Sequence, residues 1–249
     1  MKVGRTLLVY PVLGISSVLS GSAVIAMVRA GDHDGKYWWR AVVQPWAKNL
    51  IRAGGVSKVE YLGDRAALEG FRGVIMSNHE SHFDPPALIL ASDTPLRFMA
   101  KESLSRFPVF GSAMRAMGML FVDRSNKTKA WESIRAAAET LAEGKAVLVF
   151  PEGTRSKDGE LLPFKRGGFV LALESGLPIL PIGIAGTGKV LPPGWVVRDT
   201  GAAVLAVGEP IPTEGKTDLE ALMAETREAI LKLRDQARVR LREIEARRS

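Results

Sequence analysis

The chain has 249 residues, of which 46% are hydrophobic and 24% are charged, a composition typical of a globular protein that buries a sizeable core. It contains no cysteine, which excludes a disulfide scaffold, a thiol nucleophile and cysteine-ligated zinc. Its formal net charge of +7 favours anionic partners such as phosphorylated metabolites, acidic lipid surfaces or nucleic acid.

The N-terminal region carries an uncharged apolar run over residues 6–28, with basic residues before and after it. Its length is sufficient to cross a bilayer, for which roughly 20 residues are needed. Glycine, proline and serine dilute its hydrophobicity, so a kinked or half-inserted helix is as consistent with the pattern as a spanning one. A secretory signal peptide and a buried soluble helix are the alternatives. We predict membrane attachment.

A second helix is expected over residues 36–53, because its apolar positions recur at helical spacing. Its tryptophans, Trp38, Trp39 and Trp46, have basic neighbours, a combination typical of a helix that lies at a lipid interface. The alternative is a helix packed on the rest of the protein. We therefore divide the chain into N-terminal membrane-anchoring helices, 1–55, and an α/β domain, 56–249.

From residue 56 onward, short apolar runs alternate with helical patterns. The expected strands are 58–62, 74–76, 96–100, 119–122, 146–150, 178–184 and 202–207. The expected helices are 86–91, 102–117 with an interruption near Pro108 and Gly111, 127–143, 167–175 and 218–246. This alternation predicts an α/β fold, a mostly parallel central sheet flanked by helices. Several arginines cluster near the end of the last expected helix, and we interpret this helix end as exposed to solvent. They are Arg234, Arg238, Arg240, Arg242, Arg247 and Arg248.

A histidine and an aspartate follow the short strand 74–76. Asp84 precedes two prolines, a pattern typical of a helix start, because the carboxylate can cap free N–H groups and proline loses no donor there. His79 would then lie beyond the carboxyl end of a strand, where open α/β sheets bind their ligands. Asp84 can keep one imidazole nitrogen protonated and leave the other as a general base. A capping aspartate with a structural histidine is the alternative.

The polar loop 151–156 follows the strongest expected strand. Arg155 can bind a phosphate through two parallel N–H donors, and Gly153 allows the backbone to approach a ligand closely. A turn in which Glu152 simply pairs with Arg155 is the alternative.

Two further strand ends carry a cation. Lys101 follows the strand 96–100, and Arg124 follows the strand 119–122. Together with the loop 151–156, they predict an anionic substrate beside the general base; scattered surface charge is the alternative.

Four ordered blocks of the sequence resemble those of the glycerolipid acyltransferase family. They are Asn-His-x-Ser-x-x-Asp at 78–84, Gly-x-x-Phe-Val-x-Arg at 118–124, Phe-Pro-Glu-Gly-Thr-Arg-Ser at 150–156 and Leu-Pro-Ile-Leu-Pro-Ile at 177–182. Within that family, the pattern is most similar to the 1-acyl-glycerol-3-phosphate acyltransferases, which make phosphatidic acid. The resemblance extends over about residues 74–184, and its specificity comes from four blocks in the right order.

The resemblance implies a reaction. By it, His79 would deprotonate the free hydroxyl of lysophosphatidic acid, Asp84 would orient His79, and the hydroxyl would attack an acyl thioester directly. Ser81 lies near His79 but is not a nucleophile in the family, so no acyl-enzyme is expected. The implied substrate-binding residues are Lys101, Arg124, Glu152, Gly153, Thr154 and Arg155, with Lys101 assigned to phosphate or oxyanion stabilisation.

The resemblance also implies partners and a location. We expect lysophosphatidic acid, an acyl-CoA or acyl carrier protein co-substrate and membrane lipids, with no cofactor, metal or nucleic acid, at the cytoplasmic face of the cell membrane. Other acceptors, such as glycerol 3-phosphate, another lysophospholipid or a lyso-aminolipid, are alternatives within the same chemistry. A metal-dependent phosphoesterase with His79, His82 and Asp84 as ligands, and a non-catalytic lipid-binding protein, are alternatives of other classes.

Overall fold

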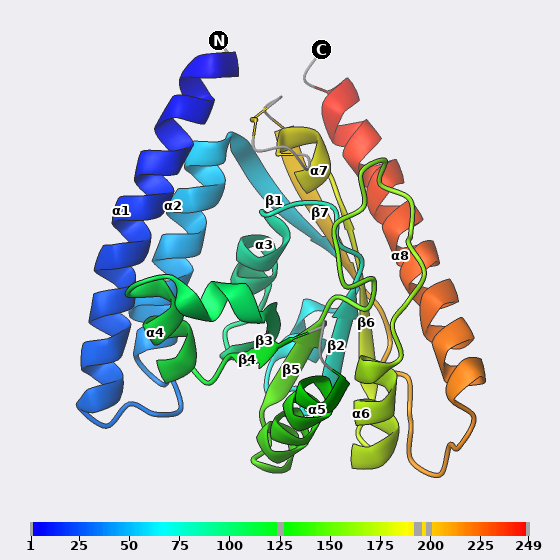
Figure 1. Cartoon of the computed structure of the whole chain (residues 1–249). Helices are drawn as coiled ribbons and strands as arrows, with labels where there is room; N and C mark the ends of the chain where they lie inside the picture. Colours follow the sequence, from blue (N-terminus) through cyan, green and yellow to red (C-terminus); the bar gives the residue numbers. More distant parts are fainter. Residues whose placement is uncertain (1, 124–126, 192–195, 198–200, 248–249) are drawn as a thin grey trace.

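A seven-stranded sheet lies between two layers of helices (Figure 1). The computed structural model describes residues 2–123, 127–191, 196–197 and 201–247. The strands are β1 (Val56–Leu62), β2 (Val74–Ser77), β3 (Leu96–Lys101), β4 (Leu120–Val122), β5 (Ala146–Val149), β6 (Ile179–Ala185) and β7 (Gly201–Val207).

The helices fall close to the segments expected from periodicity. They are α1 (Lys2–Arg29), α2 (Gln44–Gly54), α3 (Asp84–Ala91), α4 (Phe110–Ala116), α5 (Lys127–Ala142), α6 (Gly167–Ser175), α7 (Thr187–Val190) and α8 (Leu219–Ala246). A π-helical turn (Trp39–Val43) leads into α2, and two 3₁₀ turns (Arg65–Leu68 and Glu102–Arg106) lie in connections. The short helix α7 carried no sequence signal that we recognised.

The strand order is β1-β7-β6-β2-β5-β3-β4. The five strands from β6 to β4 are parallel to one another, β7 runs antiparallel to β6, and β1 runs parallel to β7. The prediction of a mostly parallel sheet flanked by helices is confirmed.

The two faces of the sheet bury alternate residues of the central strands, as the two-residue repeat of a strand requires. Ile75 and Leu148 belong to the core beneath α1, α2 and α3, whereas Val74, Met76 and Val147 belong to the core beneath α5, α6 and α8. Both faces are covered, which explains why the central strands are apolar throughout.

The carboxyl ends of β2, β5, β3 and β4 lie along one edge of the sheet, in that order. Neighbouring strands are about 4.8 Å apart, so the ends of β2 and β3, which are separated by β5, lie about 10 Å from each other. This edge carries the loops after β2 and β5, and it collects the polar residues that the sequence analysis singled out.

Helix α1 packs against α2 and α4, and α2 packs against β1 and α3, so α1 and α2 lie on the same side of the sheet (Figure 1). Trp46 of α2 donates a hydrogen bond from Nε1 to Ser17 Oγ of α1 at 3.2 Å. The apolar segment Val9–Arg29 of α1 is long enough to cross a membrane. Its residues Val9 and Val24 are only 1% exposed, so α1 contacts the domain near both of these positions.

The interpretation of Trp38 and Trp39 as lipid-facing is wrong. Both side chains are completely buried in the main core, and Trp39 donates from Nε1 to the Ser92 carbonyl at 3.0 Å. Basic neighbours such as Arg40 favour a lipid interface in the sequence, but helical spacing identifies an apolar face without identifying what covers it.

Candidate active site

A histidine and an aspartate form a short hydrogen bond at the carboxyl end of β2. His79 Nδ1 lies 2.7 Å from Asp84 Oδ2, and 17% of the His79 side chain is exposed while the Asp84 side chain is completely buried. Because an ionised carboxylate only accepts hydrogen bonds, Nδ1 must carry the proton. Nε2 is then the ring nitrogen with a lone pair, as a general base requires.

Asp84 is fixed by the loop that precedes it. Its Oδ2 also accepts the backbone N–H groups of Glu80 at 2.7 Å and Ser81 at 2.8 Å, and its Oδ1 accepts the hydroxyl of Thr187. The carboxylate therefore turns back onto the loop, as its predicted bond to His79 requires, and it does not cap α3 as the helix-start pattern predicts. Converging N–H groups favour the ionised carboxylate.

The imidazole ring of His79 is held by packing and through its backbone. The ring of Phe150 stacks on it with a centroid separation of 4.0 Å and an interplanar angle of 16°. The His79 backbone N–H donates to Glu152 Oε1 at 2.7 Å, and its carbonyl accepts from the Ser156 N–H at 2.8 Å. The loops after β2 and β5 are thereby joined at the histidine.

Ser81 has a structural role. It is completely buried, its hydroxyl donates to the Leu191 carbonyl at 2.8 Å, and its Oγ accepts the Phe83 N–H at 3.1 Å. A hydroxyl engaged on both sides and shielded from solvent is unsuited to nucleophilic attack.

Comparison with known proteins identifies the family of this chain. The acyltransferase family model matches residues 58–185. The chain belongs to the acyltransferase family. A 1-acyl-sn-glycerol-3-phosphate acyltransferase of Haemophilus influenzae is 30% identical over 178 residues, which cover 71% of this chain and 72% of that protein. A chloroplastic 1-acyl-sn-glycerol-3-phosphate acyltransferase of Brassica napus is 39% identical over 121 residues. This match covers 49% of this chain but only 35% of the length of the plant protein.

The fold of this acyltransferase is also similar to a solved structure. The crystal structure of the 1-acyl-sn-glycerophosphate (LPA) acyltransferase PlsC from Thermotoga maritima is 26% identical, with a TM-score of 0.81. The similarity covers 94% of this chain and 95% of that one. It therefore includes the N-terminal helices as well as the sheet.

Glu152 of this acyltransferase is almost completely buried and bonded on both sides. Oε1 accepts the His79 N–H, and Oε2 accepts the Leu162 N–H at 2.8 Å. Burial raises the pKa of Glu152 above its ordinary value, and the two N–H donors act in the opposite direction. Its carboxylate thus joins the backbone of His79 to that of the loop 156–165.

Arg155 lies in the loop 151–156, where its charge interacts with Asp84 and His82. Its Nη1 is buried and has no hydrogen-bond partner among the described residues. Burial lowers the pKa of its guanidinium, which nevertheless stays charged at neutral pH. Burial, with the charge of Arg155 as the next cause, lowers the pKa of the neighbouring His82 to about 4, so His82 is neutral at pH 7. A buried guanidinium nitrogen without a protein partner is suited to an anionic ligand.

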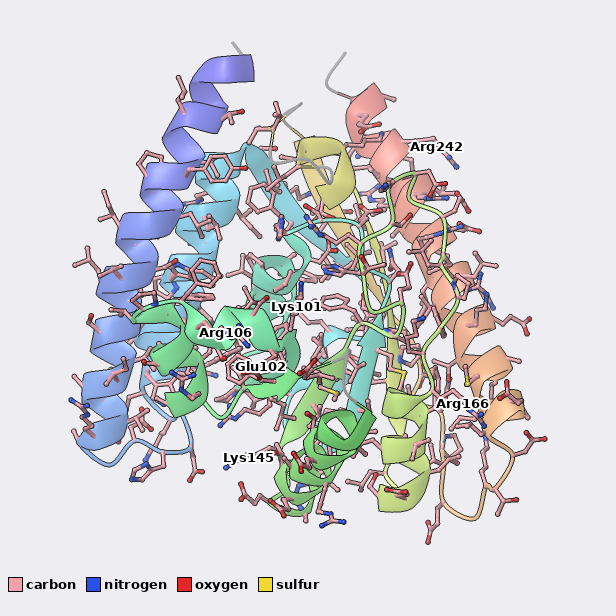
Figure 2. The ribbon with its side chains drawn as sticks, viewed as in Figure 1. Lys101, Glu102, Arg106, Lys145, Arg166 and Arg242 are labelled. Carbon is pink, nitrogen blue, oxygen red and sulfur yellow. The ribbon has the colours of Figure 1, made fainter. Side chains whose placement is uncertain are left out.

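Lys101 ends β3, is exposed, and lies near the middle of the molecule close to Glu102 and Arg106 (Figure 2). Arg124 lies outside the described residues, although β4, which leads to it, ends at the same sheet edge. Gly153 is half-buried with a φ of 72°, a conformation that favours glycine, and Thr154 beside it is exposed.

Arginines of α8 bind the loop that carries Arg155. The interpretation of the C-terminal arginines as solvated is wrong for Arg234, whose side chain is only 3% exposed, whereas Arg242 and Arg247 are exposed as expected. Gly183 allows this close packing of α8 on β6, because a Cβ there would come within 2.1 Å of the Arg234 backbone nitrogen. The bonds run from Arg227 to the carbonyls of Leu161 and Leu162, and from Arg234 and Arg238 to the carbonyl of Gly159.

Among the described residues, no three histidine or acidic side chains cluster as metal ligands would. The proposed phosphoesterase ligands His79 and Asp84 are instead bonded to each other. Three functional neighbours escaped the sequence analysis: Glu80 and Thr187, which surround Asp84, and Phe150, which covers His79. Glu80 and Phe150 lie within recognised blocks and Thr187 follows the last of them, and that position in the sequence was the available signal.

Proposed function

We propose that this acyltransferase transfers a fatty acyl group from a thioester to the free hydroxyl of lysophosphatidic acid, giving phosphatidic acid. The observation that carries the proposal is the bond from His79 Nδ1 to Asp84, near a buried guanidinium nitrogen of Arg155 that no described residue of the chain bonds. The names of the relatives from Haemophilus influenzae and Thermotoga maritima support this choice of acceptor.

The proposed chemistry is a direct transfer. His79 Nε2 takes the proton of the acceptor hydroxyl as its oxygen attacks the thioester carbonyl, and the buried Asp84 carboxylate stabilises the imidazolium that forms. Collapse of the tetrahedral intermediate breaks the carbon–sulfur bond, and the leaving thiolate recovers the proton from His79. The buried, fully bonded hydroxyl of Ser81 supports a mechanism without an acyl-enzyme.

We further propose that the acceptor phosphate binds to Arg155 together with two cations that follow neighbouring strands, the exposed Lys101 after β3 and Arg124, which follows β4 in the sequence. Gly153 and Thr154 would contribute backbone and hydroxyl contacts. Glu152 would contribute by fixing the backbone on both sides of this site. The donor is an acyl-CoA or an acyl carrier protein thioester.

The test is transfer of a radiolabelled acyl group to lysophosphatidic acid by the full-length protein in detergent. Each donor is supplied in turn, and glycerol 3-phosphate and a lyso-aminolipid serve as competing acceptors. We expect phosphatidic acid as the main product, at an undiminished rate in the presence of a chelator. If labelled product forms only with another acceptor, that acceptor replaces lysophosphatidic acid as the proposed substrate. Loss of activity with the chelator would favour metal chemistry.

Replacing Arg155 by alanine should raise the KM for lysophosphatidic acid by about 10- to 100-fold, since a charge-assisted hydrogen bond contributes about 1.5–3 kcal/mol. The KM for the acyl donor should remain within about twofold, because the guanidinium would contact only the acceptor. Arg166→Ala is the control, since Arg166 pairs with Glu220 on the surface. Equal increases in both KM values would contradict the assignment of Arg155 to the phosphate.

We propose that residues 1–55 attach the protein to one leaflet, at the cytoplasmic face. Val9 and Val24, both buried against the domain, are about 22 Å apart along α1, most of the thickness of a bilayer core. A helix packed on a folded domain over this length has only its outer side free for lipid. That outer side is apolar, because Leu7, Ile15 and Leu19 are 69%, 64% and 67% exposed.

Replacing Leu7, Ile15 and Leu19 together by glutamate should reduce co-sedimentation with phosphatidylglycerol vesicles by at least about tenfold. Burying one such side chain contributes about 1.5–3 kcal/mol, and each added carboxylate is repelled by the anionic lipid. A matched control places glutamate at Leu231 and Val239, which are exposed on α8, on the opposite side of the molecule (Figure 1). Equal sedimentation of the two variants would refute attachment through α1.

A further inference from the structure

A second buried carboxyl group lies directly behind the His79–Asp84 pair. Glu80 is 7% exposed, and its Oε1 accepts the Gly188 N–H at 3.0 Å and lies 3.0 Å from Thr187 Oγ1. The approach is close, since a Cβ at Gly188 would come within 3.2 Å of the Glu80 side chain. The mechanism proposed above does not use this group.

The hydroxyl of Thr187 is shared by two carboxyl groups. Thr187 is completely buried, and its Oγ1 contacts Asp84 Oδ1 on one side and Glu80 Oε1 on the other. A hydroxyl has one hydrogen to donate, so it can bond to only one of two ionised carboxylates. Both contacts are hydrogen bonds only if one of the two carboxyl groups carries a proton.

The hydrogen-bond donors decide which group holds that proton. Asp84 Oδ2 accepts three N–H groups, from His79, Glu80 and Ser81, and these stabilise a negative charge. The Glu80 carboxyl receives one backbone N–H, from Gly188. The charged groups that act on Glu80 are Asp84 from α3 and Arg238 from α8, and burial followed by Asp84 raises the pKa of Glu80 to about 7.

We propose that Glu80 is a neutral carboxylic acid that donates to Thr187, which donates to Asp84, and that Glu80 and Thr187 are positioning residues for the general base. The chain of donors runs from Glu80 through the Thr187 hydroxyl to Asp84 and orients the acceptor of the His79 Nδ1 proton. Neither side chain contacts the substrates. The kinetic part of this inference rests on the proposed function.

Thr187→Val removes the hydroxyl and keeps the shape of the side chain. We expect kcat to fall by about 10- to 100-fold, the effect of losing a buried hydrogen bond of about 1–3 kcal/mol, with both KM values unchanged. Thr187→Ser should restore kcat to within about threefold of wild type. The control is Thr213→Val, which also loses a buried hydrogen bond, from its hydroxyl to the Leu177 carbonyl at 2.8 Å, and should lower Tm without changing kcat.

Glu80→Ala removes the donor to Thr187, and we expect its kcat to fall by about 10- to 100-fold. Glu80→Gln should be similarly impaired, because the Gly188 N–H requires the amide oxygen at the Oε1 position and so turns the NH₂ group away from Thr187. A pKa raised to about 7 means that Glu80 keeps its proton below pH 7 and ionises above it. The kcat of wild type should therefore fall as pH rises through about 7, and this decrease should be absent in Glu80→Ala.

The inference is overturned if folded Thr187→Val or folded Glu80→Ala has wild-type kcat, or if the decrease in kcat above pH 7 persists in Glu80→Ala. An independent measurement needs no turnover: the Nδ1 proton resonance of His79, resolved by ¹⁵N labelling of the three histidines. Thr187→Val should shift or broaden this resonance, and Thr213→Val should not. If wild type makes no phosphatidic acid, the proposed function fails, and this resonance still decides the role of Thr187.

Discussion

Replacing His79 by alanine should lower kcat for phosphatidic acid formation by about 10²- to 10⁴-fold, the range typical of a lost general base. The bond from His79 Nδ1 to Asp84 leaves Nε2 of the ring free to accept a proton. Glu152 fixes the backbone of His79, and Phe150 fixes its ring. The KM for both substrates should change little, because the imidazole acts on a proton rather than on the phosphate or the acyl chain.

The control for this variant is His33→Ala, since His33 is exposed in the connection after α1. Initial rates are measured with lysophosphatidic acid and acyl-CoA or acyl carrier protein thioester, and Tm verifies folding. A His79→Ala enzyme within tenfold of wild type would eliminate the general-base mechanism and leave the overall reaction in place.

Replacing Asp84 by asparagine should lower kcat by about 10³-fold. Three N–H groups converge on the Oδ2 position, so the amide oxygen must occupy it, and the NH₂ group must face Thr187. The His79 tautomer is then preserved while the negative charge is lost. Interaction of unit charges about 4 Å apart is of the order of 4 kcal/mol near a protein surface, which corresponds to about 10³ in rate.

Asp84→Ala provides the comparison that separates charge from geometry. Alanine leaves the N–H groups of Glu80 and Ser81 without their acceptor, so Tm should fall well below that of Asp84→Asn, which keeps an oxygen there. Both variants should be nearly inactive with phosphatidic acid formation as the readout. An Asp84→Asn enzyme within tenfold of wild type would show that the charge does not stabilise the transition state.

Much of the α/β architecture was predictable, because it depends on local signals. The strand β5 and the helix α6 lie where apolar runs and helical periodicity place them, to within a residue. The His79–Asp84 pair was also predictable. The two residues are only five positions apart, and the two prolines after Asp84 mark the start of the next helix. For such features, the information lies within a single segment of the chain.

The remaining features depend on contacts between distant segments. Thr187 reaches Asp84 across 103 residues only because β6 pairs with β2 in the sheet. Trp39 is buried because Ser92, 53 residues away, supplies the acceptor for its indole N–H. Arg234 is buried because the loop after β5 offers it a carbonyl. None of these pairings can be read from residue types along the chain. The sequence therefore shows that a polar or aromatic residue is present, but it does not show which distant residue that side chain will contact.

The attachment of the loop 156–165 has a consequence for engineering a new acceptor preference. This loop is bonded at its carbonyls to Arg227, Arg234 and Arg238 of α8 and at the Leu162 N–H to Glu152. A loop grafted alone from a relative would leave these guanidinium groups and this carboxylate without matching backbone partners. The smallest exchangeable unit is therefore the loop together with the face of α8 that binds it, although the two are far apart in sequence.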